Sequence, residues 1–79
     1  MEELALSNAI ELGWKHIRPI DQEEAKAELM RYFNVISEPA WIRRLRGVVK
    51  IDREEAKDVE AIFEKYGVEP SQIWGRYEP

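Results

Sequence analysis

A seven-residue segment that occurs twice constrains this chain more than any other feature. Residues 20–26 read IDQEEAK and residues 51–57 read IDREEAK, so the two copies differ at one position. In each copy a Glu follows an Asp after three positions, which is the spacing of a capping box at a helix start. In each copy an Ile stands directly before the Asp, and an Ala stands four positions after the Asp. These two apolar residues have the spacing of a hydrophobic staple. We therefore predict helices that begin directly after Asp21 and Asp52.

Each predicted helix continues into a similar turn. Asn34 and Gly67 are residues of the kind that end helices in the left-handed conformation, and a Val follows each of them. A Trp then stands six positions after each Val. The pattern favours two related helix–turn–helix units, each a capped helix, a tight turn and a short Trp-bearing helix, although common capping chemistry could also produce it by chance. The units cover residues 20–46 and residues 51–77.

The first segment, residues 1–13, is expected to form a helix of its own. Apolar residues at helical spacing predict that this helix covers residues 2–12. Gly13 then ends it, because glycine adopts the left-handed conformation of a helix terminus at little cost. Pro19 disfavours helical backbone in the residue before it, so we expect a loop between Gly13 and Pro19.

Ser37 can cap a third helix that Gly47 ends, since Ser side chains accept hydrogen bonds from the first turn of a helix. Residues 48–51 are too few and too β-branched for a helix, so they are expected to be extended, with residues 17–20 as the partner in one small strand pair. The predicted fold is a single all-α domain, a compact bundle of four to five short helices. Its predicted core consists of Leu6, Ile10, Leu29, Phe33, Val35, Trp41, Leu45, Val59, Ile62, Phe63, Val68 and Trp74.

Composition limits the classes to which the chain can belong. With 79 residues, 44% of them hydrophobic, it can hold one small core and is not disordered by composition. It has no cysteine, which excludes disulfides and thiolate metal sites and fits a cytoplasmic protein. No apolar run approaches the ~20 residues of a membrane span. We therefore expect a cytoplasmic domain without a membrane partner.

The residues give little support for catalysis. His16 is the only histidine, and Ser37 and Ser71 stand at expected helix starts, where they act as caps. The acidic pairs at residues 23–24 and 54–55 lie in expected first helical turns, where carboxylates favour the helix dipole. We therefore expect no enzymatic activity, no cofactor and no metal ion.

The strongest binding feature is a basic stretch in a chain of net charge −4. Residues 41–53 carry five cationic side chains and a single Asp. Guanidinium groups that lie together bind phosphates or acidic protein surfaces. The same side chains could instead form a solvated face that pairs with the acidic helix turns. The candidate contact residues are Arg43, Arg44, Arg46, Lys50 and Arg53, with Trp14, Gln72 and Arg76 as additional candidates.

In residues 54–77, Gly67 stands at the predicted turn, with Val68 directly after it and Ile73 in the following helix. This arrangement resembles the helix-turn-helix of Xre-like bacterial and phage transcription regulators. The resemblance implies a helical fold and an association with nucleic acid. Phe63 departs from the motif, because a small residue is usual at its position.

A second stretch, residues 13–41, is similar to the helical segment that follows the DNA-binding domain in some Xre-type regulators with a metallopeptidase-like domain. The histidine-rich metal motif of that peptidase is absent. The expected recognition helix, residues 71–77, offers only Gln72 and Arg76 to bases, whereas major-groove reading needs several side chains on one face.

We favour a non-enzymatic, helix-turn-helix-like module associated with nucleic acid, in which the basic stretch contacts phosphates. The alternative is a protein–protein interaction module, such as an adaptor, inhibitor or docking domain. There the same cations would meet an acidic partner, and an exposed aromatic side chain would add a contact. The sequence leaves the oligomeric state open.

Overall fold

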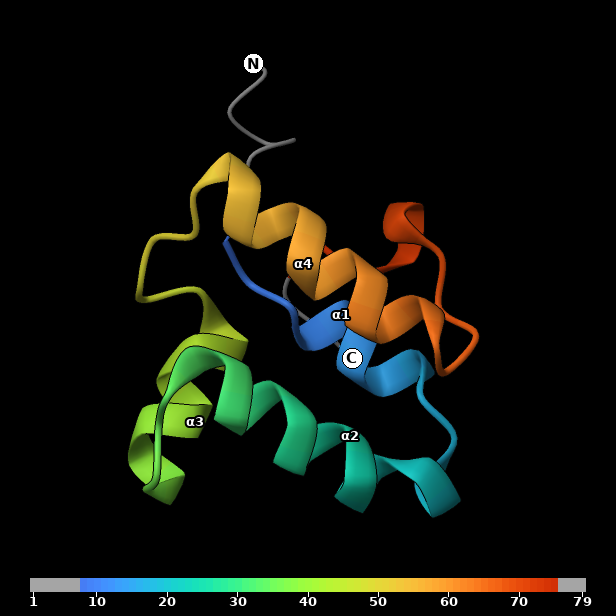
Figure 1. Ribbon diagram of the computed structural model, residues 1–79, viewed down its shortest axis with the longest axis horizontal. Helices are drawn as coiled ribbons and strands as arrows, with labels where there is room; N and C mark the ends of the chain where they lie inside the picture. Colours follow the sequence, from blue (N-terminus) through green and yellow to red (C-terminus); the bar gives the residue numbers. More distant parts are fainter. Residues whose placement is uncertain (1–7, 76–79) are drawn as a thin grey trace.

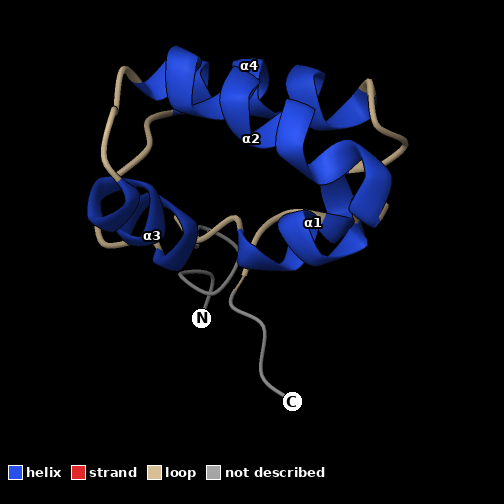
Figure 2. Ribbon diagram, turned by 90° about the horizontal axis from the view of Figure 1, so that it is seen from below, coloured by secondary structure: helices blue, strands red, loops and turns tan. Residues whose placement is uncertain are grey.

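The computed structural model describes residues 8–75, and four α-helices and one 3-10 turn form the regular structure of this stretch (Figure 1). They are α1 (Glu11–His16), α2 (Pro19–Phe33), α3 (Glu38–Arg46), α4 (Arg53–Glu64) and η2 (Pro70–Gln72). The helices α2 and α4 lie side by side in one layer, and α1 and α3 form the second layer (Figure 2). The all-α bundle predicted from the sequence is confirmed.

The strand pair expected from residues 17–20 and 48–51 is wrong, because no strand forms between residues 8 and 75. Pro19 and Ile20 instead open α2, and residues 48–51 form an irregular loop. A proline fixes φ near the helical value and has no N–H to give to a sheet, so this position favours a helix start over a strand.

Three helix ends are built in the same way. Each has a residue of positive φ, and the valine after it donates its N–H to the carbonyl five residues earlier, over 3.0 to 3.2 Å. This is the Schellman arrangement, which satisfies carbonyls left free at the helix end. The turn residues are Asn34, Gly47 and Gly67, with φ of 59°, 81° and 83°, and the valines are Val35, Val48 and Val68. The ends of α2 and α3 agree with the prediction from sequence, whereas the helix α4 ends at Glu64, and Gly67 closes the turn that follows it.

The helix starts agree with the prediction at α3 and α4. The Ser37 hydroxyl accepts a hydrogen bond from the N–H of Ala40 at 3.3 Å. At α4 the Asp52 carboxylate accepts from the N–H of Glu55 at 2.8 Å, and the Glu55 carboxylate accepts from the N–H of Asp52 at 3.1 Å. The predicted capping box is therefore confirmed in the second copy of the repeated segment.

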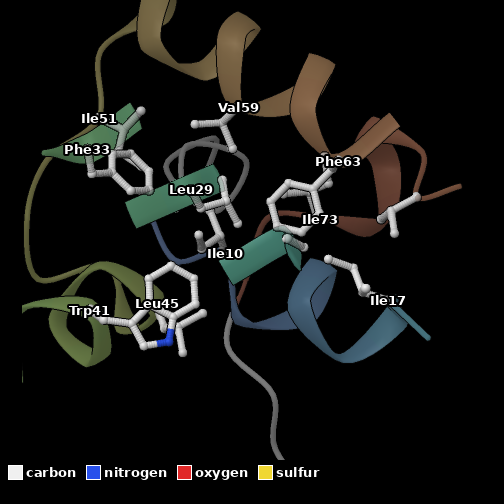
Figure 3. Packing of buried hydrophobic residues seen from close by; sticks show 12 residues of the cluster. Ile10, Ile17, Leu29, Phe33, Trp41, Leu45, Ile51, Val59, Phe63 and Ile73 are labelled. Carbon is white, nitrogen blue, oxygen red and sulfur yellow. The ribbon is translucent and has the colours of Figure 1, made fainter. Parts of the chain in front are cut away.

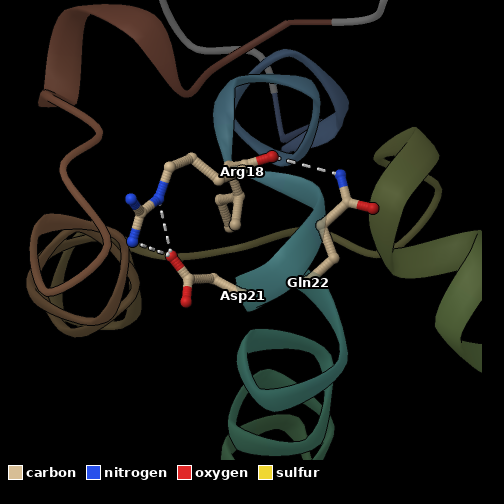
Figure 4. Close-up of polar contacts among 4 residues, drawn as sticks. Arg18, Asp21 and Gln22 are labelled. Carbon is tan, nitrogen blue, oxygen red and sulfur yellow. Dashed lines mark hydrogen bonds and ion pairs between the residues drawn. The ribbon is translucent and has the colours of Figure 1, made fainter.

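In the first copy the predicted cap is wrong. The helix α2 begins at Pro19, two residues before Asp21, and its N-cap residue makes no side-chain cap. Asp21 instead lies in the first turn and accepts two hydrogen bonds from the Arg18 guanidinium, at 3.1 and 3.0 Å (Figure 4). Ile20 is 82% exposed, so the expected staple does not form either. Proline at the first helical position moved the start upstream.

The first helix also differs from the prediction. Residues 8 and 9 are not helical, α1 runs through Gly13 rather than ending there, and residues 2–7 lie outside the described stretch. Gly13 is buried, and a Cβ at this position would lie 2.9 Å from the Cα of Ile73 and 3.1 Å from Cε1 of Phe63. Glycine is therefore needed here for a close approach between elements, and Trp14 lies in a helix instead of a loop.

The segment before and into α1 holds the two ends of the described chain together. The N–H groups of Leu12 and Gly13 donate to the carbonyls of Gly75 and Ile73, at 3.1 and 3.0 Å, and the N–H of Gly75 donates to the carbonyl of Ala9 at 2.8 Å. The first N–H groups of α1 therefore find acceptors without a side-chain cap. We call residues 8–13 and 73–75 together the terminal strap.

The core lies between the two layers (Figure 3). Most of the predicted core residues are buried, whereas Val35, Ile62 and Trp74 are half-buried against the core and Leu6 lies outside the described stretch. The confirmed buried residues are Ile10, Leu29, Phe33, Trp41, Leu45, Val59, Phe63 and Val68. Buried residues that the prediction omitted are Ala9, Ile17, Ala25, Ile51 and Ile73.

Candidate functional site

The predicted contact residues lie on α3 and just beyond it. Arg43 and Arg46 share the outer face of α3, because they are three positions apart and lie opposite the buried Trp41. Lys50 lies in the loop between α3 and α4, and Arg53 is the first residue of α4. All four cationic side chains are exposed.

Arg44 has a different role from the other four cations. It is half-buried, and its guanidinium carbon lies 4.3 Å from the centre of the Phe33 ring. One of its terminal nitrogens, Nη1, is buried and has no hydrogen-bond partner among the described residues. A cation placed over an aromatic face in this way contributes about 0.5–2 kcal/mol to packing. Arg44 therefore belongs to the contact between α2 and α3 rather than to an exposed binding surface.

Carboxylates of residues 8–75 do not neutralise Arg43, Lys50 or Arg53. The ion pairs described between residues 8 and 75 are Arg18–Asp21, Lys26–Glu38 and Lys65–Glu28. Arg43, Lys50 and Arg53 make no hydrogen bond, ion pair or ring contact in this stretch, whereas Arg46 has a contact of its own. The expectation that the basic stretch pairs with the acidic turns of the neighbouring helices is therefore not met for these three residues.

Two carboxylates, Asp58 of α4 and Glu28 of α2, instead join α2 to α4 and to the turn that follows α4. Tyr32 donates its hydroxyl to Asp58 at 2.8 Å, and Tyr66 donates to Glu28 at 3.0 Å. Burial, together with these bonds, raises the pKa of each tyrosine to about 12. The hydrogen bond from Lys65 lowers the pKa of Glu28. These carboxylates stabilise the layer of α2 and α4, and their oxygens are occupied by contacts within the protein.

Exposed apolar residues lie directly among the cations, and the sequence reading did not single them out. Ile42 is 39% exposed on α3, and Val48 and Val49 are 65% and 37% exposed in the loop after it. The Schellman bond from the N–H of Val48 to the carbonyl of Arg43 keeps the loop against the last turn of α3. We call the surface formed by Ile42, Arg43, Val48, Val49 and Lys50 the α3 corner. Its loop forms the left edge of the molecule in Figure 1.

The signal for this surface was present in the sequence. Valines at the position after a left-handed helix end normally pack against the helix, as Val68 does. Val48 stands at the same position but is left in solvent. Two consecutive valines favour a strand by β propensity, and a strand would have placed them in a sheet rather than in solvent.

The additional candidates do not join the α3 corner. Trp14 is half-buried and packs edge-to-face on Trp41, with ring centres 5.3 Å apart and planes at 77°. Trp14 thus packs against the core instead of offering an exposed contact. The Gln72 side chain accepts a hydrogen bond from the N–H of Glu69 at 3.1 Å within its own turn. Arg76 lies outside the described residues.

No known protein family, no curated protein and no solved structure matches this chain.

The expected recognition helix does not form as an α-helix in the described part. The 3-10 turn η2 covers residues 70–72, and Ile73 after it is fully buried. The Trp of the second unit, Trp74, follows this turn, whereas Trp41 lies within the nine-residue α3. A single turn presents too few side chains on one face to read bases in a groove.

Residues suited to catalysis stay apart or have structural roles. Ser37 and Glu55 are caps, and His16 is exposed at the end of α1. Within residues 8–75 no group of three His, Cys, Asp or Glu side chains is placed to hold a metal ion. Among the same residues no helix combines the length and the apolar character needed to cross a bilayer.

Proposed function

We propose that the chain is a protein-interaction module and that the α3 corner is its contact surface. The observation that carries this proposal is the exposed apolar group of Ile42, Val48 and Val49, bordered by cations that have no partner in the described stretch. Protein interfaces combine an apolar centre that loses its water with a polar rim, and arginine is enriched among their residues. The corner has both parts within one helix end and one loop.

The geometry favours a protein over a nucleic acid as the partner. Phosphate binding draws its affinity from several cations that act together, and exposed valines add little to it. Of the five predicted phosphate contacts, Arg44 is packed on Phe33 and Arg46 has a contact of its own.

Peptide display tests the proposal. Random twelve-residue peptides are selected on the wild-type chain and counter-selected on a Val48→Asp, Val49→Asp double variant. Because both positions are exposed loop residues, we expect the variant to keep the fold, and circular dichroism checks this. A matched control is Ile20→Asp, which changes an 82% exposed apolar residue in the first turn of α2. We expect a family of peptides that binds the wild type and the control and fails to bind the double variant.

Two results would overturn the proposal. If no peptide distinguishes the double variant from the wild type, the α3 corner is not a peptide-binding surface. The second arm titrates labelled duplex DNA at two salt concentrations. Phosphate binding weakens with salt by a log–log slope of about −0.9 for each phosphate contact. Tight, salt-sensitive binding that is lost in Arg43→Ala would assign the surface to nucleic acid instead.

A further inference from the structure

Two of the exposed cations stand where local helix physics does not favour a positive charge. Arg43 and Arg46 lie in the last turn of α3, where the helix dipole stabilises cations, so their positions have a local explanation. Lys50 lies in no helix, and Arg53 is the first residue of α4, at the end where the dipole favours anions. The fold alone therefore gives no reason for Lys50 and Arg53.

The repeated segment gives an internal comparison for Arg53. The one position that differs between the two copies holds Gln22 in the first copy and Arg53 in the second. The half-buried Gln22 amide donates to the carbonyls of Trp14 and Ile17, both at 3.3 Å, and so ties the end of α1 to α2 (Figure 4 draws one of the two bonds). Arg53 is exposed and makes no contact of this kind in the described stretch. The side chain at this position therefore joins two helices in the first copy, whereas in the second copy it points into solvent without a contact in the described stretch.

The acid-rich composition makes the free cations more informative. Acidic side chains outnumber basic ones by 16 to 12, and Arg18, Lys26 and Lys65 each have a carboxylate partner. Lys50 and Arg53, like Lys57 on α4, have none among residues 8–75. Neither the helix dipole nor an internal ion pair occupies Lys50 and Arg53, so both cations are available to an external anion beside the exposed valines.

We infer that the segment bound at the α3 corner is an acidic peptide whose apolar side chains lie on Val48 and Val49. Its carboxylates pair with Arg43 and Lys50 of the corner and with Arg53, which follows the corner's loop at the start of α4. This inference rests on the proposed function. The apolar members of the corner select a peptide, since an isolated phosphate or a nucleic-acid backbone has no apolar group to place on them. The cations at the rim select its charge and speed its association.

The peptides recovered by display give the first test. Among those that depend on the two valines, we expect Asp and Glu to be enriched over the starting library beside at least one large apolar residue. If the peptides depend on the valines but are neutral or basic, the charge inference is overturned and the proposed function stands. If none depends on the valines, the proposed function itself fails.

Neutralising variants give the second test, with one recovered acidic peptide as the probe. Lys50→Gln together with Arg53→Gln should weaken binding about 2- to 30-fold, because each exposed ion pair contributes about 0.2–1 kcal/mol and 1.4 kcal/mol is tenfold in affinity. The salt dependence of binding should flatten at the same time. Arg53 is exposed and takes no part in the capping box of Asp52 and Glu55, so Arg53→Gln should leave the start of α4 intact.

The control for charge is Arg18→Gln. Arg18 is exposed at the start of α2, at the opposite end of the molecule from the α3 corner in Figure 1. This variant changes the net charge by the same amount as either single neutralisation and should leave peptide affinity unchanged. Equal weakening by Arg18→Gln and Arg53→Gln would reduce the effect to overall charge and would overturn the assignment of carboxylate contacts to the corner.

Discussion

Replacing Gly13 by alanine tests the closest approach in the fold. The added methyl group would lie 2.9 Å from the Cα of Ile73, 3.1 Å from its Cγ2 and 3.1 Å from Cε1 of Phe63. The two side-chain atoms can shift by rotation. The backbone of Ile73 cannot do so easily, because its carbonyl accepts a hydrogen bond from the N–H of Gly13 at 3.0 Å. The variant therefore has to move α1 away from residues 73–75.

Two opposing effects determine the size of the change. Alanine is a better helix former than glycine by about 1 kcal/mol, which would stabilise α1. Overpacking a close contact costs about 1–3 kcal/mol, and a clash with backbone belongs in the upper part of that range. We expect the free energy of unfolding to fall by about 1–2 kcal/mol. The whole free energy of unfolding of a chain of this length is roughly 4–12 kcal/mol, so this loss is a large part of it. For a domain of this size a loss of about 1–2 kcal/mol lowers the melting temperature by about 5–15 °C.

Urea denaturation followed by tryptophan fluorescence measures the change, since Trp41 is buried and Trp14 half-buried. Ala27→Gly is the control, because it exchanges the same two residues in the opposite direction at an exposed position of α2. It should cost about 1 kcal/mol through helix propensity alone. A Gly13→Ala chain with a midpoint equal to or above that of the wild type would refute the close contact, because propensity would then be the only effect.

Two further predictions concern the start of α4 and the layer formed by α2 and α4. Asp52→Ala should lower the free energy of unfolding by about 1 kcal/mol, because Asp52 caps α4. Asp21→Ala should change it by less than about 0.5 kcal/mol, because Asp21 caps no helix and makes only an exposed ion pair. Equal losses of the two variants in urea denaturation would contradict these assignments. The pKa of both Tyr32 and Tyr66 is raised to about 12 from the usual 10, so the fold favours the neutral phenols. Their contribution to stability is complete below pH 10 and is lost as the pH rises from 10 to 12. Tyr66→Phe should make this alkaline loss smaller, and an unchanged loss would show that the hydroxyl does not titrate with unfolding.

Features decided within a few residues could be predicted from the sequence. Asn34 and Gly47 end helices because their own conformational preferences and the next N–H determine the turn. Asp52 and Glu55 satisfy each other, so their spacing alone predicts the helix start. The same reasoning failed for Asp21 because a proline two positions earlier provides an alternative start, and the capping pattern gives no way to rank the two.

Features that depend on distant contacts could not be predicted. Gly13 has the sequence context of a helix end, and only the position of Ile73, sixty residues later, shows why glycine is needed. The cations of the candidate site were evident as residues. Their division into packed Arg44 and free Arg43 could not be read from sequence, because it depends on where Phe33 lies. Val48 is likewise exposed because no other element of the described fold packs over it, and the residues next to it in the sequence give no sign of this.

The hydrogen bonds that join distant segments of the fold lie outside the α3 corner, and this explains how the corner can carry exposed apolar residues. The terminal strap and the tyrosine bonds between α2 and α4 join segments far apart in the chain. The loop of the corner is held by the helix-end bond of Val48 at one side and by the bond from the N–H of Ile51 to the Asn8 side chain, at 3.0 Å, at the other. Between these two points Val49 and Lys50 contribute no described hydrogen bond to the fold. Substitutions there should therefore change binding without changing stability, which is the property that a contact surface on so small a core requires.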